Sequence, residues 1–204
     1  LALLIKVAPI TVHLYEYANL KRLQKNYDEA LKYTQQIVDK NKKFLPAYIL
    51  MSEIYSENKD YPKAKQAIKS AESNELYSDL LYISKANLYL ETDDFEIARE
   101  AFEKALDFGI DDEIINDKIL VCKLLSSQEN NLTDEVIELT QDVENEKIPD
   151  KKAVKYLILG IWNYKENNFE RAEEFLRKAI NISTQPPIAY YILAKTYVKL
   201  DDEY

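Results

Sequence analysis

The chain of 204 residues contains two glycines, one histidine and one cysteine, and its net charge is −9. Phosphate-binding loops, dinucleotide-binding turns and nucleophile elbows need several glycines, and one histidine with one cysteine cannot form a zinc cluster or an internal disulfide. The acidic balance disfavours nucleic acid as the main ligand. We therefore expect no cofactor, no metal and no nucleic-acid partner.

Apolar stretches are short along the whole chain. None reaches the eighteen residues that a membrane-spanning helix needs, so we expect no membrane insertion. The apolar residues 1–5 follow no initiating Met or basic leader, which favours the end of a helix over a signal peptide. The unpaired Cys122 is typical of a reducing compartment and predicts a cytoplasmic protein.

A phrase in which an aromatic residue is followed three positions later by alanine recurs along the chain. Its alanines, Ala30, Ala64, Ala98 and Ala172, are separated by 34, 34 and 74 residues. Because 74 is two periods of 34 plus six, one further repeat with about six extra residues lies before Ala172. Two more rows share the period, namely the small residues Ala18, Ser52, Ala86, Gly160 and Ala194 and the tyrosines Tyr48, Tyr82, Tyr156 and Tyr190.

Each row has a mechanical explanation. Small side chains let two helices approach closely, and the aromatic residues fill the space between helix pairs. Asn or Asp precedes each aromatic residue, where its side-chain oxygen can cap the next helix. The capping positions are Asn26, Asp60, Asp94 and Asn168.

The periodicity predicts helix pairs in chain order. Residues 1–8 are expected to end a preceding helix, pairs follow over 11–41, 46–73 and 78–108, and an atypical acidic pair covers 112–146. A last pair covers 151–182, and 187–204 holds the first helix of a further repeat. The individual helices are expected at 11–24, 27–41, 46–58, 61–73, 78–91, 95–108, 112–127, 133–146, 151–165, 169–182 and 187–200.

This pattern resembles the tetratricopeptide repeat (TPR) family. The resemblance rests on the period of 34 residues, the rows above and the later Ala71, Ala105 and Ala179, and it covers most of residues 11–200. It implies an all-α fold, a right-handed α-solenoid of antiparallel helix pairs, with about five full pairs and partial repeats at both ends. We expect a single array over residues 1–204 that belongs to a longer solenoid or whose uncapped ends are covered by another chain, including by self-association.

The resemblance also implies where a ligand binds, because the first helices of TPR pairs line a concave groove. An upper apolar stripe and a lower, mostly polar stripe suit a peptide or helix with apolar anchors. The alternative is that the superhelix closes tightly and buries the stripe against the array. The predicted groove residues are Tyr15, Asn19, Ile49, Glu53, Ile83, Asn87, Leu157, Ile161, Tyr191 and Lys195.

One TPR subgroup clamps the acidic tails of chaperones with lysine, asparagine and arginine. Of the five matching positions in this chain only Asn19 agrees, so that activity is not expected.

Acidic residues concentrate in the atypical repeat. Residues 103–146 contain 13 acids and 3 bases. One interpretation is a second contact surface, at Glu135, Glu138 and Asp142, for a basic partner segment; the other is a solvated acidic face without a partner.

The remaining reactive side chains favour structural roles. The acidic clusters at 93–94, 111–113 and 201–203 lie at expected helix starts and lack calcium-loop spacing. His13, Cys122 and Trp162 are expected to pack rather than to react.

These observations predict a non-catalytic scaffold that binds protein partners. The alternative is the regulatory or substrate-recruiting arm of an enzyme whose catalytic domain lies outside this segment. A third class, a pentatricopeptide-type array that binds nucleic acid, needs a period of 35 residues and a basic groove, and both are missing.

Overall fold

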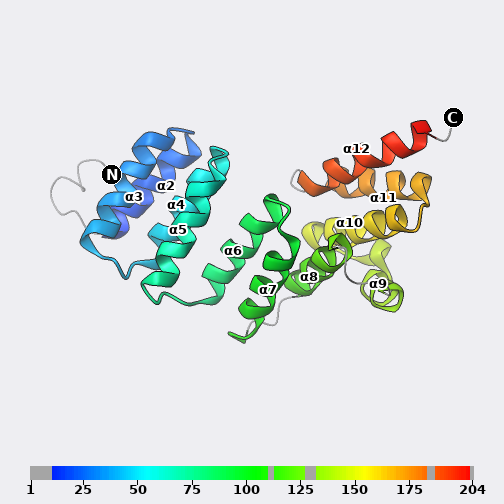
Figure 1. The fold of residues 1–204 in the computed structure, drawn as a ribbon, viewed down its shortest axis with the longest axis horizontal. Helices are drawn as coiled ribbons and strands as arrows, with labels where there is room; N and C mark the ends of the chain where they lie inside the picture. The colour runs from blue at the N-terminus through cyan, green and yellow to red at the C-terminus, as the bar shows by residue number, and fades with distance from the viewer. Residues whose placement is uncertain (1–10, 110–112, 127–131, 183–186, 203–204) are drawn as a thin grey trace. The chain divides into compact units, whose positions relative to one another are not determined.

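The computed structural model describes residues 11–109, 113–126, 132–182 and 187–202 (Figure 1). Every regular element in these ranges is helical, which confirms the all-α prediction. The expected helix end over residues 1–8 lies outside the described residues. The chain divides into two compact units, one up to Leu88 and one from Tyr89, and each is described by itself.

The first unit contains two regular antiparallel helix pairs and most of a further helix (Figure 1). The helices pack as α2 against α3 and α4 against α5. Their bounds are α2 Thr11–Leu23, α3 Tyr27–Lys40, α4 Leu45–Glu57, α5 Tyr61–Ser73 and α6 Asp79–Glu91, the last of which runs past the division.

The second unit continues the alternation with a shortened element in its middle. Its helices agree with the predicted ranges to within about two residues, apart from the one expected over 133–146. Their bounds are α7 Phe95–Leu106, α8 Glu113–Leu125, α9 Thr133–Thr140, the 3₁₀ helix η1 Val143–Asn145, α10 Pro149–Lys165, α11 Phe169–Ile182 and α12 Pro187–Asp202.

The prediction of one helix over 133–146 is wrong, because α9 ends at Thr140. Asp142 follows with φ of 57°, in the left-handed region that no helix continues through. The chain then turns into η1, and Val143 joins the hydrophobic core of the unit. The chain after Thr140 therefore forms a bend and a short 3₁₀ helix instead of a longer α-helix.

The repeated small residues lie where the helices come closest. Ala18 and Ala86 are completely buried, and so are the alanines that follow the aromatic residues, Ala30, Ala64, Ala98 and Ala172. A Cβ atom on Gly160 would lie 2.6 Å from Cγ of Leu176, so α10 and α11 approach at a distance that only glycine allows. On α12 the equivalent Ala194 and Tyr190 are exposed.

Two of the predicted N-caps are confirmed, and one is wrong. Asn26 and Asp60 each accept a hydrogen bond of 3.3 Å from the backbone N–H three residues later. Asp94 makes no such bond. Its Oδ2 instead accepts a hydrogen bond from Thr92 Oγ1 at 2.9 Å.

The turn within each regular pair has a left-handed residue immediately before the capping position. The N–H of the following residue bonds the carbonyl five residues back, as Asp60 does to Tyr55 at 2.8 Å, which is the Schellman arrangement. The left-handed residues have φ values of 58–61° and are Lys25, Lys59, Asp93 and Asn167. Glycine usually fills such a position, so these turns form with very little glycine in the chain.

Candidate functional site

In the first unit, Arg22 links the predicted groove residues Asn19 on α2 and Glu53 on α4. Asn19 Oδ1 accepts a 3.1 Å hydrogen bond from Arg22 Nε, one turn further along α2. Nη1 of the same guanidinium bonds Glu57 and lies 3.7 Å from Oε2 of Glu53, both on α4. We call Tyr15, Asn19, Arg22, Ile49, Glu53 and Glu57 the α2–α4 surface.

Apolar groups flank this polar network. Tyr15 lies one turn before Asn19, and its half-buried ring meets the edge of Phe44 at 6.0 Å between ring centroids. Ile49, one turn before Glu53, is also half-buried. The polar groups of this surface are thus fixed in place by one another and bordered by apolar side chains.

The charges on the α2–α4 surface do not balance, because two carboxylates share one guanidinium. Burial, and then the charge of Glu53, raises the pKa of Tyr15. Burial also raises the pKa of Glu53; Arg22 opposes this shift and Glu57 adds to it. The Glu53 and Glu57 side chains are 45% and 40% exposed and that of Arg22 only 20%, so the surplus negative charge faces solvent.

The predicted groove residues of α6, Ile83 and Asn87, are half-buried at the equivalent repeat positions. Their presence at one surface with α2 and α4 stays a prediction.

In the second unit, the groove prediction is wrong for Leu157 and Ile161. Both are buried, with 4% and 1% exposure, and belong to the core cluster that includes Leu124 of α8 and Ile192 of α12. The helices α8 and α10 pack against each other, and Leu120, Val121 and Leu124 of α8 belong to the same core cluster.

Tyr191 and Lys195 are exposed neighbours on α12. The Lys195 Nζ lies 4.4 Å from the centroid of the Tyr191 ring, within the range of a cation–π interaction. Contact with the Tyr191 hydroxyl, supported by the charge of Asp93, raises the pKa of Lys195.

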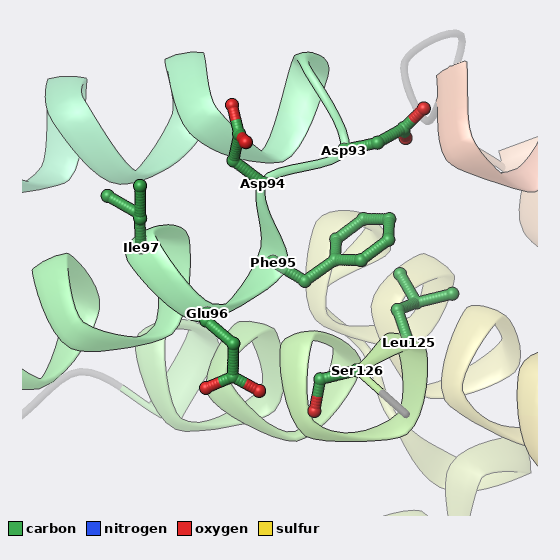
Figure 2. A pocket seen from close by; sticks show the side chains of 7 residues that line it. All are labelled: Asp93, Asp94, Phe95, Glu96, Ile97, Leu125 and Ser126. Atoms are coloured by element: carbon green, nitrogen blue, oxygen red, sulfur yellow. The ribbon is translucent and has the colours of Figure 1, made fainter. Parts of the chain in front are cut away.

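A pocket of about 330 Å³ that the sequence did not indicate lies between the start of α7 and the end of α8 (Figure 2). In Figure 2 Phe95 faces Leu125, and Glu96 lies on the side of Ser126. Two of its three acids have partners in the structure: Glu96 pairs with Arg99 at 3.0 Å, and Asp94 Oδ2 accepts a hydrogen bond from Thr92 Oγ1. Arg99, followed by Ser126, lowers the pKa of Glu96. The lining residues are Asp93, Asp94, Phe95, Glu96, Ile97, Leu125 and Ser126.

The predicted acidic contact surface is only partly accessible. Lys123 Nζ on α8 lies 2.9 and 3.2 Å from the two carboxylate oxygens of Glu135, which joins α9 to α8. Glu138 and Asp142 are exposed.

The other reactive side chains lie in structural surroundings. Cys122 is fully buried, and burial raises the pKa of its thiol to about 12, which leaves the thiol unreactive near neutral pH. Trp162 packs against the core, and His13 is half-buried on α2. Within the described ranges, no group of three or more His, Cys, Asp or Glu residues is arranged to hold a metal ion. The acids at 111–112 and at 203 lie outside the described residues.

Two sequence models of the tetratricopeptide repeat match the chain, one over residues 22–75 and the other over 81–108 and 152–186. Together they cover more than half of the chain, which belongs to the tetratricopeptide repeat family. The matches leave out the atypical repeat. Proteins of this family generally mediate protein–protein interactions. No curated protein matches the sequence.

Solved structures of TPR proteins share the fold at low sequence identity. YrrB, described as a TPR protein with an unusual peptide-binding site, is 18% identical with a TM-score of 0.61, over 92% of this chain and 94% of YrrB. A chain of the APC/C hetero-tetramer Cut9–Hcn1 is 15% identical, with a TM-score of 0.69. The match covers 96% of this chain and 38% of that chain. A TPR protein from Parabacteroides merdae is 17% identical with a TM-score of 0.58, over 95% of this chain and 73% of that protein's chain.

No helix in the described part of the chain is both long and apolar enough to cross a bilayer.

Proposed function

We propose that this chain is a non-catalytic interaction scaffold that binds a peptide or helical segment of a protein partner on the α2–α4 surface. The observation that carries the proposal is the network in which Arg22 holds Asn19, Glu53 and Glu57 in place across two helices. Polar groups that are already fixed lose little conformational freedom when a partner binds. The peptide-binding site of YrrB, a protein of the same fold, supports the same reading.

The chemistry of the surface indicates the chemistry of the partner. Tyr15 and Ile49 offer half-buried apolar contacts for an apolar anchor residue. Glu53 and Glu57 expose more charge than Arg22 neutralises, so a lysine or arginine near that anchor complements them. The segment we expect is therefore apolar and basic, the opposite of the acidic tails bound by the chaperone-clamp subgroup.

The test begins by identifying the partner segment. Affinity purification of this chain from its own cells, followed by cross-linking mass spectrometry, names the partner and the residues near it. The identified segment, made as a synthetic peptide, is then titrated against three variants of the full chain. Tyr15→Ala should weaken binding at least tenfold, because an aromatic anchor at an interface typically contributes more than 1 kcal/mol. Tyr77→Ala, which truncates a tyrosine of 54% exposure at the α5–α6 turn, is the matched control and should leave affinity unchanged.

The charge of the partner is tested separately. Glu53→Lys should weaken binding more than Glu53→Gln, and the loss should shrink as salt is raised, because salt screens exposed charges. Equal affinities for wild type, Tyr15→Ala and Glu53→Lys would overturn the proposal for this surface.

The other predicted surfaces remain proposals of the same kind. Tyr191 with Lys195 offers an aromatic and cationic pair on α12, and Glu138 with Asp142 offers exposed acids. The triple reversal Glu135→Lys, Glu138→Lys and Asp142→Lys should abolish a salt-sensitive contact with a basic segment, and an unchanged affinity removes that surface from the account. Self-association is tested by light scattering over a range of concentrations, where a constant monomer mass counts against it.

A further inference from the structure

Asp117 of α8 is a buried acid whose carboxylate is not fully bonded. Its side chain is 1% exposed, and its Oδ2 atom has no hydrogen-bond partner. It lies on the helix that packs between α7 and α10, in the atypical repeat. A buried carboxylate with an unpaired oxygen is costly when it is charged and much less costly when it holds a proton.

The neighbouring lysines are engaged by other acids. Lys151 of α10 pairs with Glu113 of α8. Lys155 of α10 has its Nζ 3.6 Å from Oε2 of Glu146, which precedes α10. The charged groups that act on Asp117 are therefore two lysines and two glutamates, and their fields oppose one another.

We propose that Asp117 is a proton-binding switch in the contact between α8 and α10, which takes up one proton in mildly acidic solution and packs more tightly when protonated. The protonated carboxyl gains a donor and loses its charge, so the cost of burying it against α10 falls. When Asp117 is ionised, the buried charge favours local opening of this contact.

The direction of the pH effect follows from the environment of Asp117. Burial raises its pKa from 3.8 to about 6, and of the two nearest charges Lys155 opposes the shift and Glu113 adds to it. The folded chain thus binds more protons than the unfolded chain between about pH 4 and 6. The stabilisation is present at the acidic end of this window and is lost as the pH rises through it. Acids with lowered pKa values, such as Glu113 and Glu146, act in the opposite direction and below this window.

The test measures thermal unfolding of the full chain from pH 5 to 7.5 for wild type, Asp117→Asn and the control Asp142→Asn. The melting midpoint of wild type should fall by about 5 °C over this range relative to Asp117→Asn, which is uncharged at every pH. Asp142→Asn removes an exposed acid of the same unit and should follow wild type. All three chains keep His13, so the difference between their curves removes its contribution.

Two further measurements keep the proposal falsifiable if Asp117→Asn does not fold. The side-chain carboxyl carbon of Asp117 in the wild type should titrate by NMR with a midpoint near 6. Hydrogen exchange in α8 and α10, corrected for the intrinsic pH dependence, should be several-fold faster at pH 7.5 than at pH 5 in wild type. Parallel melting curves for wild type and Asp117→Asn, or a carboxyl midpoint below about 4.5, would overturn the switch.

Discussion

The regular repeat of α4 and α5 and the atypical repeat of α8 and α9 reach a packed state by different means. In the regular repeat, Ser52 of α4 is buried, with 2% exposure, and α5 packs along the helix through the completely buried Ala64 and Ala71. One period after Ala86, the atypical repeat has Leu120, which is also completely buried. A large residue there keeps a second helix at a distance, and α9 packs more against α10 than against α8.

The difference shows what the small residues do. In the pairs α2–α3, α4–α5 and α10–α11, where they are present, the second helix packs against the first. In the atypical repeat, where a large residue replaces the small one, the second helix, α9, has only eight residues. The first helix, α8, packs against α7 of the preceding repeat and α10 of the next. The price is a polar interface, since α8 then buries Asp117 and is joined to its neighbours by the pairs Lys123–Glu135 and Lys151–Glu113.

The largest expected effect is at the closest helix contact. Gly160→Leu should destabilise the second unit by about 3 kcal/mol or more, because even a Cβ atom would collide with Leu176. Ala194→Leu is the matched control, since it changes the same repeat position where the helix face is exposed, and it should cost less than about 0.5 kcal/mol. Chemical denaturation of both variants measures the difference, and equal midpoints would contradict the assigned role of the small residues.

A smaller effect separates two helix starts with the same sequence pattern. Asp60→Ala should lower the free energy of unfolding by about 1 kcal/mol, because Asp60 accepts a hydrogen bond from the N–H of Lys63. Asp94→Ala should lower the free energy of unfolding clearly less, since Asp94 does not cap α7. Urea unfolding monitored separately in each unit compares them; an equal loss would show that Asp94 does cap its helix in solution.

A gain in stability is expected at a turn. Glu75 has φ of 57°, and one period later the equivalent residue is Gly109, with φ of 84°. Glu75→Gly should therefore stabilise the first unit by about 0.5–1 kcal/mol, and Gly109→Ala should destabilise the second by about 1 kcal/mol. No atom within 4 Å would meet a Cβ on Gly109, so that cost is purely one of backbone conformation. Melting midpoints that do not shift in opposite directions for the two variants would argue against these left-handed turns.

The smallest effect concerns the ionic link between α8 and α9. A double-mutant cycle of Lys123→Ala and Glu135→Ala should give a coupling of about 0.5 kcal/mol, because both side chains are partly exposed. Raising the salt concentration should reduce the coupling further. A coupling above about 2 kcal/mol would mean that this pair, and not apolar packing, holds α9 in place.

Much of the architecture could be predicted because small residues recur at the same positions of successive repeats. The alanines at 30, 64, 98 and 172 predicted where the second helices lie, and all four side chains are completely buried. The residues that escaped prediction depend on neighbours distant in sequence. The positions of Leu157 and Ile161 match the groove in a regular array, but the direct contact of α8 with α10 buries them.

The left-handed turns could not be predicted from residue types. Nothing in Lys25 or Lys59 as residue types indicates a left-handed conformation, which the Schellman hydrogen bonds impose. The pocket beside Phe95 likewise depends on the spatial arrangement of α7 and α8, which no spacing along the chain displays. The burial of Asp117 also depends on the packing of α7 and α10 around α8, which the sequence of α8 alone does not display.

Binding of a partner segment to the α2–α4 surface is best examined by backbone NMR. Titrating the cross-linked partner segment into the labelled chain should shift the amide resonances of Tyr15, Asn19, Ile49 and Glu53 first and most strongly. Shifts confined to the second unit, with these four resonances unmoved at saturation, would contradict the account.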